Sequence, residues 1–218
     1  MNWYKKARRN LGEVYTSILT PLVFDKIKEF FLHSTRAEKE YAINCKKYNI
    51  TGLNYIMINC RVGKQTIMSC NFSSWVNTIY INFQIDPTGE YYLSDIYQRI
   101  NIVLRHEIEH ALDTGTQMGM NYSDPNNDKT FENIRNYFMH PVEIRAYAVE
   151  CYFTSKKTGM PLQQIIDEKI EGIKTYLNNS NLASKYVEDL TIQIKKAWYK
   201  YLQSRYPLQS KYRIEDKV

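Results

Sequence analysis

The 218-residue sequence predicts an α+β fold. Three observations carry this prediction: alternation of apolar and polar residues between positions 53 and 85, helical apolar spacing before that segment, and several further helical stretches after it. A block of strands followed by a block of helices, without regular alternation between the two, is typical of α+β proteins. Hydrophobic residues make up 44% of the chain, which excludes disorder over most of its length.

The first 50 residues are expected to be helical. Thr20-Pro21 resembles an N-cap followed by proline at the first helical position, and apolar residues then recur near helical spacing. A second helix is expected over residues 35–48. Residues 49–52 are expected to break it, because they contain the turn-forming Asn49 and Gly52.

Three strands are expected after this helical segment, over residues 53–62, 65–72 and 76–85. The third shows the clearest pattern, since Ile79, Ile81, Phe83 and Ile85 face one way and polar residues the other. Consecutive strands joined by short turns favour an antiparallel meander.

The remainder of the chain is expected to be helical. Ser94 is expected to cap a helix that runs to about Thr114, and residues 115–129 form a long loop. Four more helices are expected over residues 131–138, 141–157, 161–177 and 182–206. The predicted organisation is a helical segment, a central core and a helical extension that form one compact unit, over residues 1–50, 51–160 and 161–218.

Composition restricts the setting and the partners. No run approaches the 18 apolar residues of a membrane-spanning helix, and the N-terminal residues lack the apolar core of a secretory signal. A cytoplasmic or virion-associated protein without membrane contact is therefore expected, with its four cysteines reduced because they show no metal-binding CxxC spacing. The net charge of +6 is modest, so the basic runs 5–9 and 195–200 are interpreted as solvated faces and nucleic-acid binding is not expected.

Residues 106–110 read His-Glu-Ile-Glu-His and lie inside the helix predicted to follow Ser94. Residues four apart lie one helical turn apart on the same face, so His106 and His110 can offer two imidazole nitrogens to one ion. Glu107 lies about 100° round the axis from His106, within reach of a metal-bound water. A hydrolytic zinc site requires this arrangement, with a third protein ligand and one position left for water. Zn²⁺ lowers the pKa of that water, and the carboxylate takes its proton.

The third ligand must come from elsewhere in the chain. Glu143 follows His110 by 33 residues and lies near the start of a predicted helix. Asp113, His140 and Glu150 are alternatives. The side chain of Asp113, three residues after His110, is expected to point away from the ion or to orient a ligand, and His140 could cap the following helix.

The HEIEH motif followed by His-Pro-Val-Glu-Ile-Arg-Ala-Tyr-Ala resembles the zincin metallopeptidases, specifically the gluzincin-like branch with a glutamate ligand. The long loop before a Glu-x-x-Ala helix is also similar to the ImmA/IrrE-type and phage-encoded zincins. The resemblance covers residues 50–160. It implies Zn²⁺ held by His106, His110 and Glu143, with Glu107 as general base. It also implies a meander whose edge strand, expected at residues 76–85, pairs with an extended peptide substrate.

The expected function is hydrolysis of peptide bonds, with a protein or peptide as substrate. A donor must stabilise the oxyanion of the tetrahedral intermediate, and the candidates are Tyr122, Tyr137, His140 and Tyr147. The loop 115–129 could cover the cleft as a lid. Two alternative functions are compatible with the sequence: a zincin-fold structural or virion-associated protein with a vestigial or non-catalytic metal site, and a basic nucleic-acid-associated protein.

Overall fold

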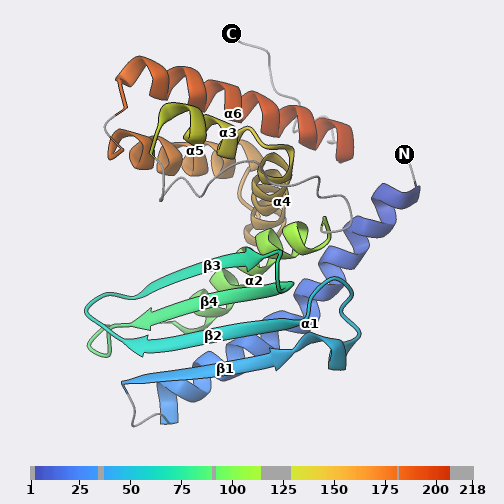
Figure 1. The fold of residues 1–218 in the computed structure, drawn as a ribbon, viewed down its shortest axis with the longest axis vertical. Coiled ribbons are helices and arrows are strands. Elements are labelled where there is room, and N and C mark those ends of the chain that lie inside the picture. Colours follow the sequence, from blue (N-terminus) through green and yellow to red (C-terminus); the bar gives the residue numbers. More distant parts are fainter. Residues whose placement is uncertain (1–2, 34–36, 90–91, 114–128, 181, 207–218) are drawn as a thin grey trace. The chain divides into compact units, whose positions relative to one another are not determined.

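The computed structural model describes residues 3–33, 37–89, 92–113, 129–180 and 182–206 (Figure 1). The chain divides into two units, residues 1–117 and 118–218. The first holds a four-stranded sheet with two helices, and the second holds helices, so the predicted α+β class is confirmed. The boundaries expected at residues 50 and 160 stay predictions. None of the described helices is long and apolar enough to cross a membrane.

The first unit begins with one long helix, α1 (Trp3–His33), which contains Pro21. The prediction that a helix starts at Thr20-Pro21 is therefore wrong. Pro21 lies on the exposed face, whereas a buried stripe continues past it on the other face. This stripe consists of Tyr15, Leu19, Val23, Ile27 and Phe30. Thr20 bonds to the backbone oxygen of Thr16 instead of capping a helix.

The sheet is mixed, with the strand order β1-β2-β4-β3. Its strands are β1 (Glu38–Asn44), β2 (Tyr55–Val62), β3 (Ile67–Ser73) and β4 (Thr78–Ile85). The positions of β2, β3 and β4 agree with the prediction, but the meander does not, because β2 pairs with β4 in parallel and β3 lies beyond β4. In the hairpin formed by β3 and β4, the second strand β4 lies next to β2. The first strand β3 therefore lies at one edge of the sheet, and β1 lies at the other (Figure 1).

Residues 37–48, the described part of the segment 35–48, do not form the predicted helix. They contain β1 and a short 3-10 helix, η1 (Cys45–Tyr48), and β1 runs antiparallel to β2 from Glu38↔Arg61 to Asn44↔Tyr55. Tyr41 and Ile43 are buried on one face of the strand, with exposed residues between and beside them. The predicted break at residues 49–52 is confirmed, since both Asn49 and Gly52 have positive φ.

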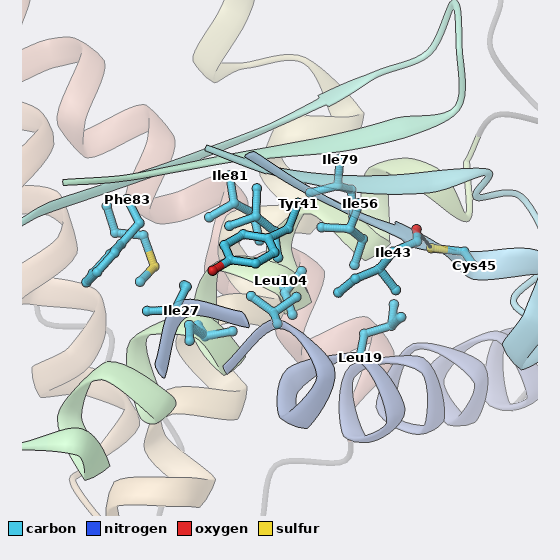
Figure 2. Close-up of a cluster of buried hydrophobic side chains, with 14 of the residues drawn as sticks. Leu19, Ile27, Tyr41, Ile43, Cys45, Ile56, Ile79, Ile81, Phe83 and Leu104 are labelled. Atoms are coloured by element: carbon cyan, nitrogen blue, oxygen red, sulfur yellow. Dashed lines mark hydrogen bonds between the residues drawn. The ribbon is translucent and has the colours of Figure 1, made fainter. Parts of the chain in front are cut away.

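The core of the first unit lies between one face of the sheet and the two helices. Leu19 and Ile27 of α1 and Leu104 of the second helix face a layer of side chains from the strands (Figure 2). This layer includes Tyr41, Ile43, Ile56, Ile79, Ile81 and Phe83. The alternation predicted for the third strand is confirmed, since its four apolar residues are all buried.

The second helix of this unit, α2 (Leu93–Ala111), carries the HEIEH motif. Its apolar stripe is buried, as predicted, at Ile96, Ile100, Leu104 and Ile108. The helix starts one residue before Ser94, with Tyr92 at the N-cap and no side-chain capping bond, so the predicted cap is wrong. Because α2 packs on both α1 and β3, its polar residues near the C-terminal end are enclosed on two sides.

The second unit is helical, as predicted. It contains α3 (Phe131–Phe138), α4 (Pro141–Thr158), α5 (Leu162–Asn178) and α6 (Ser184–Arg205). Pro141 occupies the first turn of α4 and Gly159, with φ of 74°, ends it. The helix α4 packs against both α5 and α6 around a core that includes Cys151, Ile166 and Trp198.

Candidate metal centre

The C-terminal half of α2 buries an unusual set of polar side chains. Arg105, His106, Glu107, Glu109 and His110 are all less than 9% exposed. A helix packed on one side normally leaves such residues in water, because transfer of a charged group out of water is costly unless it is paired or binds a metal. Polar burial on this scale is typical of a functional site.

The two histidines point their rings at the same place. Their Nε2 atoms lie 3.1 Å apart, and the ring centroids are separated by 4.9 Å. With Zn–N bonds of about 2.0–2.1 Å, that separation corresponds to an N–Zn–N angle of roughly 100°, close to tetrahedral. The same separation also fits a hydrogen bond between the rings. Metal binding therefore requires both rings to keep their proton on Nδ1, which leaves both Nε2 lone pairs available.

The other buried polar residues of this segment lie on either side of the helix face that carries the two histidines. Arg105 forms an ion pair of 2.6 Å with Glu109, one turn along α2. This pair faces α1, where the backbone at Gly12 passes so close to the Arg105 guanidinium that a Cβ atom would collide with it. Glu107 lies on the opposite side of the histidine pair, about 160° round the axis from Glu109.

Glu107 faces β3. Burial raises the pKa of the Cys70 thiol well above its usual value, and the nearby Glu107 carboxylate raises it further. Cys70 lies on β3 and is partly buried, on the same face as Met68 and Phe72. The carboxylate predicted to act as general base is thus next to the edge strand. Cys70 is not among the site residues predicted from the sequence, because no local pattern links it to residue 107.

Glu143 lies in the first turn of α4 and is 3% exposed. His106, His110 and Glu143 form a buried group of side chains that could hold a metal ion. Two imidazoles and one carboxylate are the ligands of catalytic zinc sites that keep one coordination position open. The donor set therefore fits Zn²⁺.

Two of the alternative third ligands have other roles. His140 is the N-cap of α4, where its Nδ1 accepts a hydrogen bond of 3.4 Å from the Val142 backbone N–H. Burial lowers the pKa of His140, while the Glu143 carboxylate acts in the opposite direction. Glu150, two turns along α4, forms an ion pair of 2.6 Å with Lys169 of α5. Asp113 follows α2 and is 2% exposed, with its backbone N–H bonded to the oxygen of His110.

The described tyrosines among the candidate oxyanion donors make packing contacts with other aromatic residues. Tyr147 stacks on Trp198 with a centroid distance of 5.3 Å, and Tyr137 contacts Phe138 edge-on at 5.1 Å. Both contacts belong to the core of the second unit. Tyr122 and residues 115–128 of the predicted loop lie outside the described residues.

The expected substrate-pairing strand needs correction. Residues 76–85 form β4, which is paired on both sides and has no free edge. The edge strand beside α2 is β3. In the described part of the chain, β1 and β3 are each paired on one side only, and of these two edge strands β3 is the one that packs beside α2, where an extended peptide could add to it.

No protein family, curated protein or solved structure matches this chain. The resemblance to zincins therefore rests on the sequence motif alone.

Proposed function

We propose that this protein is a zinc-dependent peptidase. The observation that carries the proposal is the pair of imidazole Nε2 atoms 3.1 Å apart on α2, with the buried Glu107 carboxylate one residue after the first of them. In this proposal His106, His110 and Glu143 hold the ion.

When bound, Zn²⁺ supplies a Lewis acid and lowers the pKa of a coordinated water. Glu107 accepts the proton of the attacking water and delivers it to the nitrogen of the leaving amine. Its burial suits this role, because removal from bulk water strengthens the response of the carboxylate to nearby charge. The edge strand β3 supports the choice of a peptide substrate, since its free backbone groups can pair with an extended chain next to Glu107.

A purely structural metal site is less well supported. Structural zinc sites are closed by four protein ligands and need no base beside them. Among the described residues the candidate group comprises three side chains, and Glu107 is buried next to two of them.

The proposal is tested with Glu107→Gln in the full chain, and Glu188→Gln on the exposed face of α6 serves as the matched control. Both variants should bind about one zinc per chain by metal analysis. Glu107→Gln should cleave fluorescently labelled, unfolded casein at least about 100-fold more slowly, whereas Glu188→Gln should cleave at the wild-type rate. Cleavage by Glu107→Gln at the wild-type rate, or an undiminished rate after zinc removal, would overturn the proposal.

The third ligand is tested separately. Glu143→Ala should lose most of the bound zinc, while Glu150→Gln should retain it because Glu150 pairs with Lys169. Retention of zinc by Glu143→Ala would remove this residue from the ligand set without affecting the role assigned to Glu107.

A further inference from the structure

A cavity lies inside the first unit, between the start of β3 and the N-terminal half of α2. Its volume is about 270 Å³. Three buried side chains, Met68 of β3, Phe83 of β4 and Ile96 of α2, supply apolar surface. Tyr92, which is 72% exposed, and the exposed residues Asp95 and Arg99 line its mouth. An open cavity with apolar walls and a polar rim is suited to a ligand group that is itself apolar.

The cavity and the candidate metal centre share the same two elements. Met68 lies two residues before Cys70, which faces Glu107, so the two positions are about 7 Å apart along the strand. Arg99 lies seven residues before His106 on α2, or about 10 Å along the helix axis. The cavity therefore continues the line of β3 away from the proposed catalytic residues.

An extended peptide paired with β3 would alternate its side chains between the two faces of the sheet. Those that share the face of Met68 and Cys70 point into the space between β3 and α2, where the cavity lies. A peptide residue two or four positions from the one opposite Cys70 has its side chain on the same face and would reach the cavity.

The volume decides what kind of group fits. Pockets for drug-sized ligands and cofactors occupy about 300–1,000 Å³. At about 270 Å³ this cavity is smaller, and it suits one large side chain such as phenylalanine, leucine or methionine.

We infer that this cavity is a specificity pocket that binds one large apolar side chain of an extended peptide lying along β3. This inference rests on the proposed peptidase function, because a specificity pocket selects the substrate of an enzyme. The pocket itself can be tested without catalysis.

The test blocks the mouth of the cavity with Arg99→Trp. The matched control is Gln98→Trp, on the neighbouring exposed position of α2, which does not line the cavity. In a peptide library cleaved by the zinc-loaded wild-type protein, one position two to four residues from the cleaved bond should prefer large apolar residues over glycine by about 10- to 100-fold in kcat/KM. Arg99→Trp should lose this preference but still cleave, and Gln98→Trp should keep it. An identical preference in Arg99→Trp would overturn the pocket and leave the peptidase proposal intact.

Binding gives a second readout that does not depend on cleavage. A blocked alanine pentapeptide with one central phenylalanine should bind the full chain at least about 10-fold more tightly than the all-alanine peptide, as measured by NMR titration. The difference should disappear in Arg99→Trp and persist in Gln98→Trp. Equal affinity of the two peptides for the wild-type protein would refute the pocket. A protein that binds the phenylalanine peptide selectively but cleaves no peptide would refute the peptidase function alone.

Discussion

The buried ion pair of α2 gives the sharpest prediction for stability. The Arg105 guanidinium and the Glu109 carboxylate are 2.6 Å apart, and their side chains are 1% and 0% exposed. Glu109→Gln removes one charge and with it the ion pair that Glu109 forms with the buried guanidinium. Loss of one member of a buried ion pair costs about 3–5 kcal/mol in the free energy of unfolding, because the remaining buried charge loses the interaction with its counter-charge. The double variant Arg105→Met, Glu109→Leu removes both charges and should recover most of that loss.

Thermal unfolding followed by circular dichroism measures this effect. A change of 1 kcal/mol shifts Tm by about 2–4 °C in a chain of this size, so Glu109→Gln should lower Tm by roughly 6–20 °C. The surface control Glu188→Gln should stay within about 0.5 kcal/mol of the wild type. A Tm for Glu109→Gln within about 2 °C of the wild type would refute the reasoning, as would a double variant no more stable than the single one.

A substitution at Gly12 tests independently whether the Arg105 guanidinium packs against α1. Alanine is normally favoured over glycine inside a helix by about 0.5–1 kcal/mol. At Gly12 the added methyl group would collide with the Arg105 guanidinium, so Gly12→Ala should destabilise the wild-type protein. In the Arg105→Met background the obstacle is smaller, and the sign of the effect should reverse. Stabilisation by Gly12→Ala in the wild type would show that the guanidinium does not pack there.

Three further predictions concern metal, thiols and pH. Zinc at 100 times its Kd should add about 2.7 kcal/mol to the free energy of unfolding, and calorimetry should show no such gain in His110→Ala. Burial raises the pKa of Cys45 and of Cys60 to about 12, so neither thiol should react with a disulfide reagent until the protein is unfolded with urea. Hydrogen bonds from Lys39 and then Lys26 lower the pKa of Glu29 to about 2 from 4.5. The stability that Glu29 contributes is present above pH 4.5 and is lost towards pH 2, so the gap between the wild type and Glu29→Gln in urea unfolding should narrow over that range.

Much of the helical structure could be predicted because the signals are local. Pro141 and Gly159 mark the two ends of α4, and the bounds of α3 were predicted to the residue. The spacing of His106 and His110 is also local, since a single helical turn fixes which face they share. These parts depend on residues within one element.

The errors concern contacts between distant residues. The alanine, glutamate and lysine residues of β1 favour a helix, but pairing with β2 and burial of Tyr41 and Ile43 override that preference. The alternation in the strands was detected correctly, yet it is compatible with both a meander and the observed order β1-β2-β4-β3. Strand order is decided by packing against α1 and α2, and the pattern within one strand carries no information about it.

The candidate site depends both on local spacing within α2 and on contacts between α2 and distant elements. Successive residues on α2 point about 100° apart, so Arg105 with Glu109, the histidine pair, and Glu107 occupy three different sectors of the helix. The first sector is matched by the missing side chain of Gly12 on α1, and the third by the edge strand β3 at Cys70. A one-residue insertion between Ile100 and Leu104 would turn these sectors by about 100° relative to Ile96 and Ile100, the buried residues of the stripe that precede it. It would direct the buried ion pair away from the space at Gly12 and turn Glu107 away from β3. The motif alone therefore does not make the site: its phase relative to Ile96 and Ile100 is what places each charged group beside the element that can accommodate it.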